Sequence, residues 1–195
     1  MERREAVELL AVAPFVGALP LPPAAARRGA QFIRELLAAA PQAYAPKFFS
    51  AHEWQTVRVL VDLLIPKDQR SGSATDAAVP EFMDFILVEY PDNQLWIRGG
   101  LAWLDTECRR RFGKDFLGAD DAHRTTVLDD IAWPDKAPST LHQGVVFFNR
   151  FRDFTASGFW SSQMGVADIQ YMGNVFHDWQ GCPPDQLRKL GLSSD

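Results

Sequence analysis

The stretch FFSAHEWQTVRVLVDLLIP, residues 48–66, carries the clearest structural signal in the chain. Ser50 is a residue type that caps helix N-termini, and Glu53, three positions later, completes the pattern of a capping box. Apolar residues recur at helical spacing until Pro66, which cannot continue a helix. The stretch therefore predicts one helix with a single buried stripe, made up of Trp54, Val57, Leu60, Val61 and Leu64.

Helix signals also occur on both sides of this stretch. A short helix is predicted over residues 31–40, and Pro41 follows it. The polar, small residues of 66–79 are typical of a loop. Another helix is predicted to begin at Pro80, because proline is tolerated in the first turn, where its missing N–H is not needed.

A long helix is predicted from Pro91 through Phe112, since apolar residues recur along it and Gly113 is a suitable C-cap. Helical spacing assigns five of its residues to the buried face. These are Leu95, Trp96, Leu101, Leu104 and Cys108.

Shorter helices follow towards the C-terminus. Asp120, Ser139 and either Ser161 or Ser162 are the expected N-caps, because their side chains accept hydrogen bonds from free helix amides. The second of these helices has an apolar stripe of Val145, Phe148, Phe151 and Phe154. The expected ranges are 121–132, 139–157, 162–170 and 185–190.

No stretch shows the sustained alternation of apolar and polar residues that marks a half-buried strand. A length of 195 residues with 47% hydrophobic content suits one domain with a substantial core. The predicted fold is all-α: a compact helical domain over residues 31–195. Its C-terminal part, rich in glycine and aromatic residues, is predicted to be a long irregular segment.

Residues 1–30 form a separate N-terminal arm in this scheme. Arg3 and Arg4 precede an uncharged run over residues 9–26, which is the layout of an export signal, and paired arginines are typical of the twin-arginine route. We therefore expect a periplasmic protein. Three glutamates among the first eight residues depart from this pattern, and an arm that docks on a partner is the alternative. Four prolines argue against a membrane-spanning helix.

The overall charge gives no indication of a nucleic-acid partner, because the net charge is -5 and the pI is about 5.4. The six tryptophans exceed what a small core usually buries, so some are expected at an interface. Cys108 and Cys182 are too few for a disulfide framework or a four-cysteine zinc site. A single bridge between them is possible if the chain is exported.

Familiar catalytic and cofactor motifs are missing from the sequence. It has no Gly-rich phosphate or dinucleotide motif, and no two histidines are spaced to share a helix face, so neither a cofactor nor a metal is expected in this chain. Asp62, Asp68 and Asp76 could suggest a cation site, but their spacing matches no EF-hand, and solvated loop carboxylates are the favoured interpretation. Cys182 near His177 could act as nucleophile and base, although a structural cysteine is favoured.

Two stretches carry a family resemblance. The first is GFWSSQMGVADIQYMGNVFHDWQGCP, residues 158–183, and the second runs from LIP at 64–66 through VPEF at 79–82 to Asp84. Together they resemble the gluconate 2-dehydrogenase subunit 3 family, over most of residues 48–192. In the first stretch the matching residues are Gly158, Phe159, Ser162, Gly165, Tyr171, Gly173, Asn174, Trp179, Gly181, Cys182 and Pro183.

The resemblance implies a non-catalytic small subunit that accompanies a large FAD-dependent flavoprotein of the glucose-methanol-choline oxidoreductase class. FAD would sit in that partner, a cytochrome c subunit could receive its electrons, and membrane association would come only through the complex. The small subunit would help the large one to fold and to be exported; a detachable export chaperone is the alternative. The residues expected in the interface or the packed tail are Trp160, Tyr171, Asn174, Trp179 and Cys182.

Overall fold

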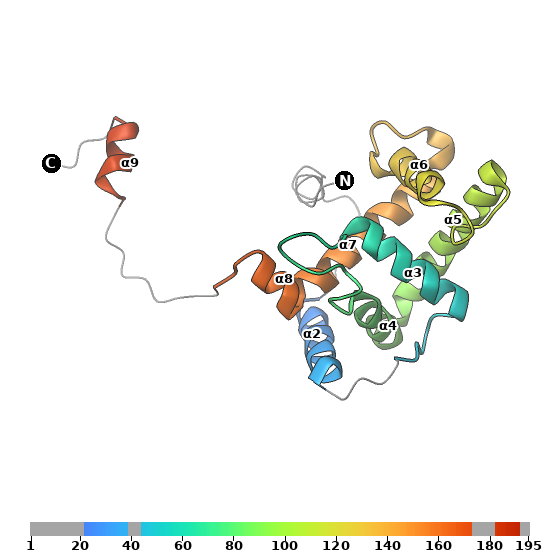
Figure 1. Cartoon of the computed structure of the whole chain (residues 1–195), viewed down its shortest axis with the longest axis horizontal. Helices are drawn as coiled ribbons and strands as arrows, with labels where there is room; N and C mark the ends of the chain where they lie inside the picture. Colours follow the sequence, from blue (N-terminus) through green and yellow to red (C-terminus); the bar gives the residue numbers. More distant parts are fainter. Residues whose placement is uncertain (1–21, 39–43, 173–181, 192–195) are drawn as a thin grey trace.

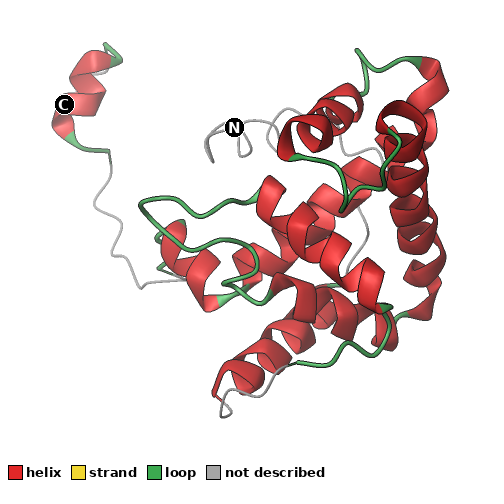
Figure 2. Cartoon of the chain, turned by 45° about the vertical axis from the view of Figure 1, so that its right-hand side comes forward, coloured by secondary structure: helices red, strands yellow, loops and turns green. Residues whose placement is uncertain are grey.

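A computed structural model describes residues 22–38, 44–172 and 182–191. All regular structure in these ranges is helical, which confirms the predicted all-α class (Figures 1 and 2). The α-helices are α2 (Pro23–Ala38), α3 (Ala51–Leu64), α4 (Val79–Glu89), α5 (Gln94–Phe112), α6 (Asp121–Ala132), α7 (His142–Ser161), α8 (Gln163–Asp168) and α9 (Pro184–Lys189). Two short 3-10 turns, η1 (Pro91–Asn93) and η2 (Ser139–Leu141), precede α5 and α7.

Helix α7 is the central element of the bundle. It packs against α2, α3, α4, α5, α6 and α8, and Figure 1 shows it running through the middle of the molecule. Its predicted apolar stripe is confirmed, because Val145, Phe148, Phe151 and Phe154 are all buried. The domain is therefore organised as helices surrounding α7.

The ring of Phe82, on α4, fixes the spacing of three helices. It is buried between Gly29 of α2 and Gly158 of α7. A Cβ atom at Gly29 would lie 2.3 Å from Phe82 Cε2, and one at Gly158 would lie 2.9 Å from Phe82 Cδ1. Both distances are too short for ordinary packing, so the two helices can approach the ring this closely only because each carries glycine there.

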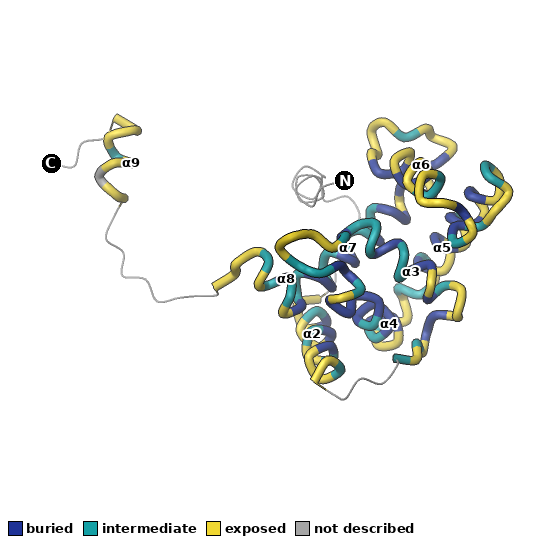
Figure 3. The backbone as a smooth tube through the Cα atoms, viewed as in Figure 1, coloured by how far each residue is buried: buried dark blue, intermediate teal, exposed yellow. Residues whose placement is uncertain are grey.

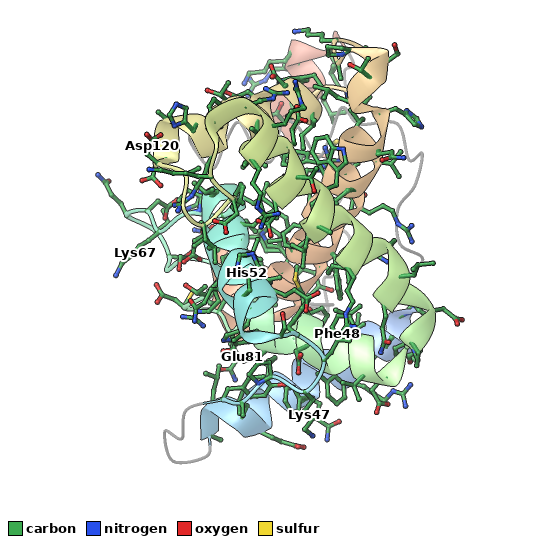
Figure 4. All side chains as sticks on the ribbon, turned by 90° about the vertical axis from the view of Figure 1, so that its right-hand side faces the viewer. Lys47, Phe48, His52, Lys67, Glu81 and Asp120 are labelled. Carbon is green, nitrogen blue, oxygen red and sulfur yellow. The ribbon has the colours of Figure 1, made fainter. Side chains whose placement is uncertain are left out.

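A buried carboxylate ties α4 to the segment that leads into α3. Asp84 is fully buried and accepts hydrogen bonds from the Tyr44 hydroxyl and from the backbone amides of Lys47, Phe48 and Phe49. The donor–acceptor distances are 2.8, 2.8, 2.9 and 3.2 Å, respectively. These hydrogen bonds hold residues 44–49 against α4, although 35 to 40 positions separate the donors from Asp84 along the chain. Figure 4 labels two of these residues, Lys47 and Phe48.

The local helix signals gave accurate boundaries. Ser50 and Glu53 form the predicted capping box of α3, and Gly113 ends α5 in the left-handed conformation with φ of 72°. Asp120 caps α6, and Ser162, rather than Ser161, caps α8. These predictions succeeded because each depends on residues within one turn of the helix end.

Other expectations were wrong. Helix α2 runs from Pro23 to Ala38, whereas the sequence predicted a helix over 31–40; its buried residues, Ala25, Gly29 and Ile33, are mostly small and form no stripe of large apolar side chains. Ser139 begins η2 and does not cap α7, which continues to Ser161. Leu95 is 86% exposed, because the buried face of α5 is centred on Ile97, Leu101, Leu104 and Cys108.

Replacing Gly29 with alanine is expected to lower the free energy of unfolding by about 1–3 kcal/mol, because overfilling a packed core shifts rings and backbone. Gly99→Ala is the matched control in another helix, since a Cβ atom there meets nothing within 4 Å. It should raise the free energy of unfolding by about 0.5–1 kcal/mol. Urea unfolding of the purified chain measures both. A stabilising Gly29→Ala would contradict the close contact with Phe82.

Candidate interaction surface

Helices α5 and α7 approach each other closely through two reciprocal contacts. Phe147 of α7 lies against Gly100 of α5, and Trp103 of α5 lies against Gly144 of α7. A Cβ atom at Gly100 would lie 1.7 Å from Phe147 Cδ2, and one at Gly144 would lie 2.2 Å from Trp103 Cη2. Each helix therefore receives an aromatic ring where it has no side chain of its own.

A groove of about 390 Å³ lies along this helix pair and is open to solvent. Its α5 wall follows the i, i+3, i+4, i+7 pattern that places residues on one helix face. Its α7 wall contributes the half-exposed Val146 and the buried ring of Phe147. The lining residues are Trp96, Gly99, Gly100, Trp103, His142, Gln143, Val146, Phe147 and Arg150.

Arg150 gives the groove its positive charge. Its guanidinium carbon lies 4.6 Å from the centroid of the Trp96 ring, a cation–π arrangement. No carboxylate among the described residues pairs with Arg150, and burial lowers its pKa below the usual value. The groove thus combines aromatic walls with a partly desolvated cation.

The sequence-predicted tail residues are only partly described. Trp160 is half-buried at the end of α7, its ring packs edge-on against Phe159, and its indole Nε1 is buried without an acceptor among the described residues. Tyr171 is exposed, like Ile169 and Met172, so three exposed apolar or aromatic side chains follow α8. Figure 3 shows the backbone after α8 in the colour of exposed residues. Asn174, His177, Trp179 and the arginine pair Arg3 and Arg4 lie outside the described residues.

The two cysteines differ strongly in their surroundings. Cys108 is buried in α5, and burial, together with the nearby Asp105 carboxylate, raises its pKa to about 11. Cys182 is exposed, and both thiols are free in the structure. The predicted bridge remains a prediction, because residues 173–181, which precede Cys182, lie outside the described residues.

One pair that the sequence reading missed is His52 with Asp105. His52 Nε2 lies 2.6 Å from Asp105 Oδ2, and Asp105 Oδ1 accepts a hydrogen bond from the backbone amide of Phe116. His52 belongs to α3, where Figure 4 labels it, Asp105 belongs to α5, and Phe116 lies in the turn before α6. The pair therefore links these three segments. No local sequence pattern predicts it, because His52 and Asp105 are 53 positions apart.

Asp62, which belongs to α3, and Asp76, in the loop that follows, both accept hydrogen bonds from that loop. Asp62 accepts hydrogen bonds from the backbone amide and hydroxyl of Thr75, at 2.8 and 2.6 Å, and Asp76 accepts one from the amide of Ser73. The prediction of a solvated carboxylate was therefore wrong for Asp62. Within the described ranges, no group of three or more His, Cys, Asp or Glu side chains is placed to hold a metal ion.

Comparison with known proteins gives one match. The family model of gluconate 2-dehydrogenase subunit 3 matches residues 51–181, which extend from the start of α3 past the end of α8. No curated protein and no solved structure matched the chain. Across the part of the chain described, no helix has the length and apolar character required to cross a bilayer.

Iodoacetamide treatment of the folded chain near neutral pH should alkylate Cys182 and leave Cys108 unmodified. Burial shields the Cys108 thiol and keeps it protonated, and only the thiolate is reactive. Peptide mass spectrometry before and after denaturation measures both sites, with Cys182→Ser as the control that should show no labelling when folded. Rapid labelling of Cys108 in the folded chain would contradict its burial. Protection of both thiols until reduction would instead establish the bridge.

Proposed function

Because the chain belongs to the gluconate 2-dehydrogenase subunit 3 family, we propose that it is the non-catalytic small subunit of a heteromeric FAD-dependent dehydrogenase. The family is named for one subunit of a dehydrogenase, so its members associate with other subunits. In our proposal the large subunit holds FAD and oxidises a sugar, sugar acid or related alcohol. A cytochrome c subunit is a further proposed partner, and membrane association comes only through the complex.

The observation that carries this proposal is the extent of the family match, which takes in α3 to α8 and thus most of the helical bundle. Two exposed apolar features support a role in assembly: the groove between α5 and α7, and the stretch around Tyr171 and Met172. Interfaces of permanent complexes are large and rich in apolar contacts. A subunit that works by association needs such surfaces.

Export is the second part of the proposal. The small subunit would fold with the large one and carry it through the twin-arginine route to the periplasm. Arg3 and Arg4 support this, since paired arginines before an uncharged run are typical of that route, which accepts folded cargo. The matched family region begins at residue 51, so this part rests on the N-terminal sequence alone.

Purification of tagged, full-length chain from its native host should bring down a large partner. The eluate is expected to contain a second, larger chain and to show the absorbance spectrum of a bound flavin, because the cofactor belongs to that partner. Size-exclusion chromatography with mass spectrometry would identify both chains. A lone, colourless and monodisperse chain would contradict a stable complex. A partner found only in the cytoplasmic fraction would favour a chaperone that detaches after export.

Replacing Arg3 and Arg4 together with lysine is expected to abolish periplasmic accumulation of both subunits, because the route recognises the arginine pair. The complex itself should still form in the cytoplasm, since the helical bundle is unchanged. Cell fractionation followed by immunoblotting and a flavin assay measures both effects. Lys67→Arg, a conservative change in an exposed loop, is the control. Normal periplasmic levels of the double-lysine variant would contradict this route.

A further inference from the structure

We infer that the groove between α5 and α7 docks a segment of the large flavoprotein subunit that inserts an apolar side chain between the helices and places an aspartate or glutamate on Arg150. This assignment rests on the proposed function and names the surface through which the small subunit would act.

The apolar lining favours a protein segment over a small ligand. Trp96 and Trp103 are partly exposed along α5, and Val146 is 45% exposed on α7. Leu95, in the same turn as Trp96, is more exposed still. A small molecule within the groove would leave Leu95 uncovered, whereas a partner segment lying along the two helices can cover it together with the groove. Tryptophans in such positions are typical of interface residues that dominate binding.

The charge of the groove specifies a carboxylate. Among the described arginines, Arg150 alone combines partial burial with the lack of a carboxylate partner. The other half-buried arginines are each paired: Arg58 with Glu81, Arg111 with Glu107 and Asp130, Arg124 with Asp121, and Arg152 with Asp153.

The groove lining contains no acidic residue, and His142 is its only other titratable group. A planar guanidinium that is already held over a tryptophan ring is well placed to bind a carboxylate through two hydrogen bonds. The contact with the Trp96 ring restrains the Arg150 side chain before the partner arrives, so less conformational entropy is lost on binding. The complementary group on the partner is therefore acidic.

Gly99 allows the groove to be filled without disturbing the fold. It lines the groove, and a Cβ atom there meets nothing within 4 Å. Gly99→Leu should therefore occupy the groove and block an incoming side chain, while Arg150→Glu should repel the incoming carboxylate. Lys136→Glu is the matched control: Lys136 also lies over a tryptophan, 5.1 Å from the ring centroid of Trp133, but outside the groove.

The test uses the full-length tagged chain, co-expressed with the flavoprotein identified by the native purification. Bound flavin per tagged chain is the readout, and circular dichroism with urea unfolding establishes that each variant is folded. Gly99→Leu and Arg150→Glu should each retain no more than about one tenth of the flavoprotein that the wild type retains. This is the loss expected when a desolvated interface contact is blocked or repelled. Lys136→Glu should retain wild-type amounts.

If the wild type retains the flavoprotein and both folded groove variants do so equally well, this assignment is overturned while the proposed function stands. If the wild type itself captures no flavoprotein, the proposed function fails and this assignment fails with it. The two failures are thus distinguished by the wild-type sample.

A photo-crosslinking amino acid at Val146 gives a second readout, which does not depend on affinity. It should crosslink to a flavoprotein peptide that contains an aspartate or glutamate, and the same amino acid at Trp133, outside the groove, should not. Changing that acidic residue to arginine should restore binding of the Arg150→Glu variant. Crosslinks confined to a second copy of this chain, or to a flavoprotein peptide without an acidic residue, would overturn the assignment.

Discussion

The buried carboxylate of Asp84 is the constraint on which the arrangement of the bundle depends. A polar group with no exposure to water is costly unless it is hydrogen-bonded, so Tyr44 and the amides of residues 47–49 must stay in place around Asp84. Those residues lead directly to the Ser50 cap, so Asp84 also sets where α3 begins. On the same helix, Phe82 fixes the distances to α2 and α7. Helix α4 is therefore the reference to which three other helices are positioned.

Sequence alone predicted the parts of the fold that are decided locally. The capping box at Ser50, the glycine at 113 and the cap at Asp120 each depend on a few neighbouring residues, and all three were placed correctly. The start of α2 was missed because its contact face is made of small residues. Such residues give no apolar pattern in the sequence, and their role in packing is evident only from the Phe82 ring that lies against them. The role of Asp84 was equally invisible, since most of its partners are backbone amides from a distant segment.

The candidate surface was predictable only in part. The surplus of tryptophans indicated an interface, but the sequence pattern favoured the tail as its location. There Trp160 is half-buried, Tyr171 is exposed, and Asn174 and Trp179 lie outside the described residues. The pattern Trp96, Gly99, Gly100, Trp103 is visible in the sequence as two large residues around two small ones. It became interpretable only with Gly144 and Phe147, because a groove is a property of two helices and neither one specifies it by itself.

The close contact of α5 with α7 and the groove beside it have the same cause. Where glycines let the backbones approach, the rings of Phe147 and Trp103 pack across the pair, and the open position at Gly99 leaves space on the solvent side. A larger helix-forming residue at position 99 would fill that space with a side chain of this chain itself. It would also stabilise α5, because glycine has a low helix propensity. Glycine at this exposed site therefore costs stability and keeps the groove open. Arg150 has no carboxylate partner in the described chain, and in the docking proposed for this groove the partner segment supplies the missing carboxylate and apolar side chain.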